Sequence, residues 1–219
     1  MHTNIGRHLQ SSPGRLGLAS LVGVGAAAGD LLIVWSGQRD DARWLLAFVA
    51  LVVQASLARG DLAGAGIRLG PEQSWGYWGW MTAWIGLAVA ACIAVGLGLV
   101  VLRGHEVRIH ETSPSDLTPA LLTACVLAPV LEETNYRLVL CVPLAVSLRP
   151  WGAVAASGLL FAALHFAYGN PSPENLAGGF FLAWAFLKSG SITVPVLLHS
   201  LGNLVAVGSQ VAAGYWGKG

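Results

Sequence analysis

The stretch that decides the fold is residues 117–147, which read LTPALLTACVLAPVLEETNYRLVLCVPLAVS. It is apolar almost throughout, yet it places Glu132, Glu133 and Arg137 within six consecutive positions. Ionisable side chains cost free energy in hydrocarbon, so charges inside an apolar helix indicate a functional site. We therefore take these three residues as the centre from which the function has to be explained.

The composition of the whole chain indicates a membrane protein. Of its 219 residues, 55% are hydrophobic and only 11% are charged. A soluble domain carries about 25% charged residues, so the surface of this chain cannot be mainly water-facing. The formal net charge is +1 and no run of Lys and Arg occurs, so we expect no nucleic-acid partner. We expect an integral, multi-pass protein whose main partner is the lipid bilayer.

Apolar segments long enough to cross a bilayer predict about seven spans, three before a polar loop at 103–116 and four after it. The fourth span exceeds the length that one straight crossing needs, and Pro129 and Pro143 predict kinks or a break in it. We predict an all-α polytopic transmembrane bundle. Residues 1–116 would hold the first three spans and the loop, and residues 117–213 a four-helix catalytic core. The seven expected segments are 16–36, 43–58, 79–102, 117–147, 151–168, 175–188 and 192–213.

Two further motifs follow the first on later spans. They are Phe161-Ala162-Ala163-Leu164-His165 and His199-Ser200-Leu201-Gly202-Asn203. In an α-helix, residues four apart share a face, so Glu133 can pair with Arg137 and His199 lies beside Asn203. Glu132 points about 100° away from Glu133 on the same helix, which leaves one carboxylate for the Arg and the other for a cavity.

These residue types suit the hydrolysis of a peptide bond. Glu132 with His165 can activate a water molecule as a general base. His199 and Asn203 offer two donors to one point, which a developing oxyanion requires. A metal centre is the alternative, because His165, His199 and Glu132 are plausible zinc ligands around one open position.

Several of these residues also have purely structural explanations. Glu133 and Arg137 can form a buried ion pair without any catalytic role. Phe161 suits packing or one wall of the site, and Tyr136 suits either the core or a hydrogen bond to the site. Asp30, near the end of the first span, fits an interfacial residue.

The three motifs, in this order on successive apolar helices, resemble the CAAX-protease and bacteriocin-processing (CPBP, or Abi) family of intramembrane proteases. The resemblance covers roughly residues 117–212. It implies a glutamate-dependent mechanism in which Glu132 and His165 activate water and His199 with Asn203 stabilises the oxyanion. Glu133 and Arg137 complete the first motif. Family descriptions also include metal dependence, so zinc stays the alternative to a site without a cofactor.

The resemblance also implies a class of substrate. Members cleave prenylated proteins, mature bacteriocins or process C-terminal sorting tails, the last a sortase-like role. We expect an endopeptidase of a bacterial inner membrane that cuts a membrane-anchored or lipidated protein near its C-terminus. The alternatives are a non-catalytic scaffold or immunity protein and a proton-coupled transporter. Two departures bear on the substrate class, the polar Asn135 and the order Tyr136-Arg137-Leu138 where members have Phe-Arg-Gly.

Overall fold

The computed structural model describes residues 4–37, 40–104 and 116–216. Within these ranges the chain is helical and contains no strand. Six helical stretches in the described part are long and apolar enough to cross a membrane: Pro13–Trp35, Asp41–Ala58, Trp75–Gly96, Leu117–Ser147, Arg149–Ala167 and Thr193–Ala212. The prediction of an all-α, multi-pass protein is confirmed. The remaining expected segment, 175–188, forms the shorter helix α9 (Pro173–Ser189) of 17 residues, and most of the expected polar loop, 105–115, lies outside the described residues.

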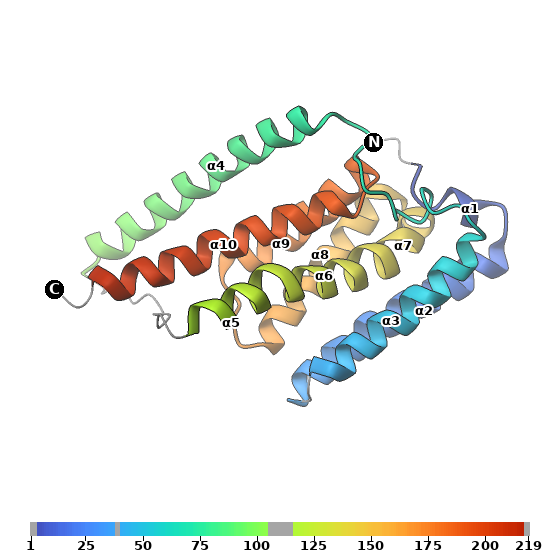
Figure 1. Cartoon of the computed structure of the whole chain (residues 1–219), viewed down its shortest axis with the longest axis horizontal. Helices are drawn as coiled ribbons and strands as arrows, with labels where there is room; N and C mark the ends of the chain where they lie inside the picture. Colours follow the sequence, from blue (N-terminus) through green and yellow to red (C-terminus); the bar gives the residue numbers. More distant parts are fainter. Residues whose placement is uncertain (1–3, 38–39, 105–115, 217–219) are drawn as a thin grey trace. The chain divides into compact units, whose positions relative to one another are not determined.

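The chain forms two compact units, Met1–Glu72 with Ala128–His199 and Gln73–Leu127 with Ser200–Gly219. The first contains α1 (Arg7–Gln10), α2 (Pro13–Trp35), α3 (Asp40–Ala58), α8 (Arg149–Ala167) and α9. It also contains the second half of the charged stretch. The second unit contains α4 (Trp75–Leu102), and α10 (Thr193–Trp216) runs through both units (Figure 1). The functional division of the sequence at residue 116 stays a prediction.

The charged stretch is helical from end to end, so the prolines do not break it. It consists of α5 (Leu117–Leu122), the π-helical segment η2 (Thr123–Leu127), α6 (Ala128–Glu133), the π-helical segment η3 (Thr134–Cys141) and α7 (Val142–Ser147). A proline lacks the N–H for the usual helical bond, and its ring crowds the carbonyl four residues back. Pro129 and Pro143 each follow a π-helical segment closely, so the wider turns accompany the prolines without ending the helix.

A side chain from α3 bonds to the backbone at the second proline. Pro143 cannot donate to the carbonyl of Val139, and the Nε2 of Gln54 donates to that oxygen at 3.0 Å. The same amide donates to the carbonyl of Ala19 in α2 at 2.8 Å. Gly23 lets α2 approach here, because a Cβ at that position would lie 2.8 Å from the Val139 oxygen. A buried amide therefore joins α2, α3 and η3 where the proline interrupts the helical bonding.

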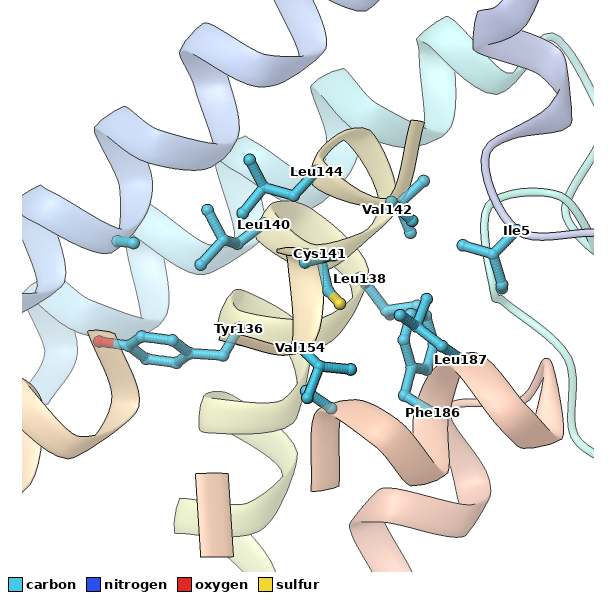
Figure 2. Close-up of a cluster of buried hydrophobic side chains, with 14 of the residues drawn as sticks. Ile5, Tyr136, Leu138, Leu140, Cys141, Val142, Leu144, Val154, Phe186 and Leu187 are labelled. Atoms are coloured by element: carbon cyan, nitrogen blue, oxygen red, sulfur yellow. The ribbon is translucent and has the colours of Figure 1, made fainter. Parts of the chain in front are cut away.

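The apolar core of the first unit surrounds η3. Figure 2 shows the side chains of η3 and α7 meeting those of α9 and the segment before α1. Tyr136 is fully buried at the edge of this cluster, and its hydroxyl points away from the other labelled side chains. The core thus fixes the rotation of η3, and with it the direction of the charged residues on the same helix. The labelled core residues are Ile5, Tyr136, Leu138, Leu140, Cys141, Val142, Leu144, Val154, Phe186 and Leu187.

Replacing Gly23 with alanine is expected to destabilise the first unit, because the new methyl group would collide with the Val139 carbonyl. Overpacking of this kind costs about 1–3 kcal/mol, more than the gain of up to about 1 kcal/mol that alanine brings to a helix. The matched control is Gly25→Ala on the same helix, where a Cβ meets nothing within 4 Å. Thermal unfolding in detergent should show a lower midpoint for the first variant and an unchanged or higher one for the second. Equal midpoints would show that the close approach is unimportant.

Candidate active site

The predicted site residues of the first unit come from four elements. Glu132 and Glu133 end α6, Tyr136 and Arg137 lie in η3, Phe161 and His165 lie in α8, and His199 lies in α10. All seven are buried, and Glu133, Tyr136 and Arg137 have no solvent exposure at all. Because unpaired charges are not tolerated at such depth, the partners of each carboxylate and guanidinium define what the site can do.

Glu133 and Arg137 form the buried ion pair that their spacing predicts. The Nε of Arg137 lies 2.8 Å from Oε2 of Glu133, although its N–H does not point along that line, and Nη2 donates to Oε1 at 3.4 Å. Nη1 of Arg137 donates to the hydroxyl of Ser157 in α8 at 2.8 Å, and that hydroxyl donates to the carbonyl of Tyr136 at 3.1 Å. The pair therefore ties η3 to α8 as well as balancing charge.

His199 lies between the two glutamates. Its Nδ1 is 2.9 Å from Oε1 of Glu133, and its Nε2 is 3.9 Å from Oε2 of Glu132. A carboxylate only accepts hydrogen bonds, so Nδ1 donates to Glu133 when that group is ionised. Nε2 of His199 can then donate to a third group only when the ring carries both protons. Glu133 thus fixes the orientation of the histidine as well as pairing with Arg137.

His165 is oriented by its own helix. Its Nδ1 lies 3.0 Å from the carbonyl oxygen of Phe161, one turn earlier. A carbonyl oxygen accepts and never donates, so Nδ1 carries the proton and Nε2 of the neutral ring carries the lone pair. This tautomer suits a group that accepts a proton or a hydrogen bond from water.

Phe161 is the common wall of the site. Its ring centroid lies 4.6 Å from that of His165, 5.8 Å from that of His199 and 5.5 Å from that of Tyr136. The guanidinium carbon of Arg137 lies 5.0 Å from the same centroid, within the range of a cation–π contact. The phenyl ring therefore lies next to both histidines and to the guanidinium of Arg137.

Glu132 has a charged neighbour that sequence reasoning missed. Besides His199, its carboxylate faces Arg43 of α3, with Nη2 3.8 Å from Oε1. Both separations exceed hydrogen-bonding distance. Arg43 is the first residue of the expected span 43–58. Its helical neighbours carry no motif, so the sequence offered no signal for this contact.

Asp30 of α2 is also part of this cluster, so a structural or functional role within the protein applies to it whatever its depth in the membrane. The side chain is buried and receives Nε of Arg43 at 2.7 Å and Nη2 at 3.1 Å. The hydroxyl of Tyr136 donates to Oδ2 of Asp30 at 3.2 Å, and Nη1 of Arg43 donates to the hydroxyl of Tyr168. Tyr136 therefore lies in the core, and its hydroxyl bonds to Asp30; a hydrogen bond from Tyr136 to the proposed catalytic residues stays a prediction.

Asn203 lies in the second unit, one turn beyond His199 along α10. Its Nδ2 donates to the carbonyl of Ala124 in η2 at 2.6 Å. A primary amide has two N–H donors, so one of them remains for another acceptor. His199 and Asn203 thus lie four residues apart on one helix, as their motif predicts.

No group of three or more His, Cys, Asp or Glu side chains among the described residues is arranged to hold a metal ion. His165, His199 and Glu132, the alternative zinc ligands, therefore do not form a ligand cluster in the described part of the chain. We derive no step through a metal, and the choice between a metal and a glutamate mechanism stays open to experiment.

Comparison with known proteins identifies the C-terminal part of the chain. Residues 114–205 match the model of the family described as "Rce1-like: Type II CAAX prenyl endopeptidase Rce1-like". No curated protein and no solved structure matches the chain. The matched segment contains all three motifs and agrees with the extent that the resemblance predicted. Residues 114–205 are therefore similar to the Rce1-like type II CAAX prenyl endopeptidases, and this likeness supports an intramembrane protease.

Proposed function

We propose that the chain is an intramembrane endopeptidase that uses Glu132 as its catalytic carboxylate. The observation that carries this proposal is the placement of Glu132, which is 4% exposed and lies 3.8 and 3.9 Å from the charged or ionisable groups of Arg43 and His199. Oε1 of Glu133 accepts from His199 and Arg137, and its Oε2 lies 2.8 Å from Nε of Arg137, whereas the Arg43 and His199 nitrogens stay 3.8 and 3.9 Å from Glu132. Glu133 therefore holds Arg137 and His199 in place, and Glu132 can accept a proton from a reacting water.

The reaction would proceed by direct attack of water. Glu132 takes one proton from the water while the oxygen bonds to the carbonyl carbon of the scissile peptide. The π electrons of that carbonyl move onto its oxygen, which becomes the oxyanion. When the tetrahedral intermediate collapses, the C–N bond breaks and the proton held by Glu132 passes to the leaving nitrogen. The products are one new carboxyl end and one new amine.

His165 would orient the attacking water. Its Nδ1 is held by the Phe161 carbonyl, so the neutral ring presents Nε2 as an acceptor for the second hydrogen of that water. A histidine in this tautomer complements a carboxylate base, because the two acceptors together fix both hydrogens of the water and aim an oxygen lone pair at the substrate.

His199 and Asn203 would stabilise the oxyanion. With Nδ1 of His199 donating to Glu133, the doubly protonated ring donates from Nε2. Asn203 would add the N–H that its bond to Ala124 does not use. Loss of one such donor costs about 10²–10³-fold in rate in other hydrolases.

The substrate that we propose is a membrane-anchored or lipidated protein cut near its C-terminus, including a sorting tail of the kind processed in a bacterial inner membrane. Support comes from the family, whose name specifies CAAX prenyl endopeptidases, and from the placement of the glutamates on a helix long and apolar enough to cross a membrane. Such a site can act on a peptide bond that lies within or beside the bilayer.

Replacing Glu132 with glutamine should stop the processing of a discrete set of host membrane proteins. A general base contributes about 10²–10⁴-fold, and glutamine keeps the shape of the side chain but cannot take a proton. The measurement is a mass-spectrometric comparison of host membranes, scored for C-terminal tails that persist. Glu174→Gln, the same change at an exposed residue in the first turn of α9, is the control and should process normally.

Identical tails in wild type and the Glu132 variant, with both proteins well expressed, would reject the protease. Proton-coupled uptake lost in that variant would then favour a transporter, and no phenotype at all would favour a scaffold or immunity protein.

Replacing Glu133 with glutamine should chiefly destabilise the protein. Arg137 would remain buried without its counter-charge, and breaking a buried pair costs about 3–5 kcal/mol. Thermal unfolding in detergent is expected to show a clearly lower midpoint for Glu133→Gln than for Glu132→Gln. If the two midpoints fell equally, the division between a structural and a catalytic glutamate would be wrong.

Chelation distinguishes the two chemistries left open by the sequence. We expect cleavage by the purified protein to survive prolonged dialysis against EDTA and 1,10-phenanthroline, because Glu132 and His165 would activate the water without a metal ion. Activity that disappears on dialysis and returns with added zinc would establish the metal-dependent alternative.

A further inference from the structure

We propose that Arg43, held in place by Asp30, is a positioning residue for the catalytic carboxylate Glu132. The active site would then be completed by α2 and α3, outside the segment that matches the family model. This inference rests on the proposed function of Glu132 and adds a part to it that neither the three motifs nor the family match contains.

The guanidinium of Arg43 is fixed by several partners from different helices. Nε and Nη2 engage the two oxygens of Asp30 at 2.7 and 3.1 Å, which is the forked geometry of an arginine–carboxylate pair. Nη1 bonds to the hydroxyl of Tyr168 at the end of α8, and the guanidinium carbon lies 5.2 Å from the centroid of that ring. Contacts on both ends of a planar group leave it little freedom to rotate.

The fixed guanidinium of Arg43 determines the position of the positive charge beside Glu132. Nη2, the nitrogen that bonds to Oδ2 of Asp30, is also the one that lies 3.8 Å from Oε1 of Glu132. Arg43 is 3% exposed and Glu132 is 4% exposed, so water screens this attraction little. The arginine attracts the catalytic carboxylate without forming the short bond that would make it a second structural pair.

Asp30 explains why that short bond does not form. A lone arginine beside Glu132 would be free to move towards it and form a direct forked pair, as Arg137 approaches Glu133 at 2.8 Å. Asp30 instead holds the fork, and the hydroxyl of Tyr136 donates to the same aspartate at 3.2 Å. Asp30 is thus the group that keeps Arg43 at a distance from the catalytic carboxylate.

The balance of buried charge gives independent support. Among the buried side chains that the structure describes, the carboxylates are Asp30, Glu132 and Glu133 and the guanidiniums are Arg43 and Arg137. Arg137 is engaged by Glu133, so Arg43 is the permanent positive charge nearest to Glu132. Without it, the only charged or ionisable partner within 4 Å of the Glu132 carboxylate among the described residues would be His199, at 3.9 Å.

The test uses Asp30→Asn, Arg43→Gln and the double variant Asp30→Asn/Arg43→Gln, each as full-length protein in lipid vesicles. Arg43→Gln leaves the buried carboxylate of Asp30 without its guanidinium and should lower the unfolding midpoint, whereas Asp30→Asn leaves Arg43 able to pair directly with Glu132. The double change removes both charges and should recover most of that loss. If Arg43 positions Glu132, kcat on a farnesylated CAAX peptide or on an uncut host tail stays at least about tenfold low in the double variant. Because Arg43 is not expected to touch the peptide, KM should change little.

Recovery of kcat together with stability in the double variant would overturn the proposal, because it would show that the pair only holds α2 and α3 together. The matched control is Arg15→Gln, which removes another arginine bond between these helices, from Nη1 to the carbonyl of Leu57 at 3.4 Å. That variant should keep its kcat. A tenfold loss there would also contradict a role specific to Arg43.

A second readout does not depend on cleavage. The infrared carboxyl bands of protein labelled with ¹³C-glutamate can be assigned to Glu132 by their loss in Glu132→Gln. Arg43→Gln should move the assigned band, and Arg15→Gln should not. An unmoved band in Arg43→Gln would reject the positioning role even if activity fell. If Glu132→Gln itself keeps full activity, it is the proposed function that fails, and the infrared result still decides whether Arg43 acts on Glu132.

Discussion

The ion pair between Glu133 and Arg137 is the interaction on which the rest of the site depends. Charges buried among apolar helices are tolerated only with partners, and this pair provides them at 2.8 Å with no solvent exposure. It also orients the two groups beside it. One oxygen of Glu133 holds His199, and Arg137 reaches across to Ser157 in α8. The pair therefore fixes the geometry around it, and our proposal assigns catalysis to the neighbouring Glu132.

Much of this arrangement could be predicted from the sequence. Low charge and long apolar segments indicated an all-α membrane protein, and helical spacing paired Glu133 with Arg137. The three motifs indicated a family of the kind whose model matches residues 114–205. These features are local, or they follow from the period of a single helix, so they are visible in one chain.

The rest depends on contacts between distant segments. Gln54 donates to the carbonyl of Val139, which Pro143 leaves without its usual donor. The sequence around either residue gives no sign of this contact. Pro143 indicated a kink or break, whereas the π-helical turns before it let the helix continue. Asp30 and Arg43 lie on two apolar helices that carry none of the three motifs. Only the packing of α2 and α3 against η3 brings them to the glutamates.

The most direct test of the central claim, that Glu132 activates water for peptide hydrolysis, is cleavage by the purified protein in vesicles prepared in ¹⁸O-labelled water. The substrate is a single membrane-anchored protein with its C-terminal tail. The account predicts one cut near that tail, one ¹⁸O atom in the new carboxyl end, and no product from Glu132→Gln. A product from both proteins, or a cut that transfers the new end to another amine without taking up ¹⁸O, would contradict it.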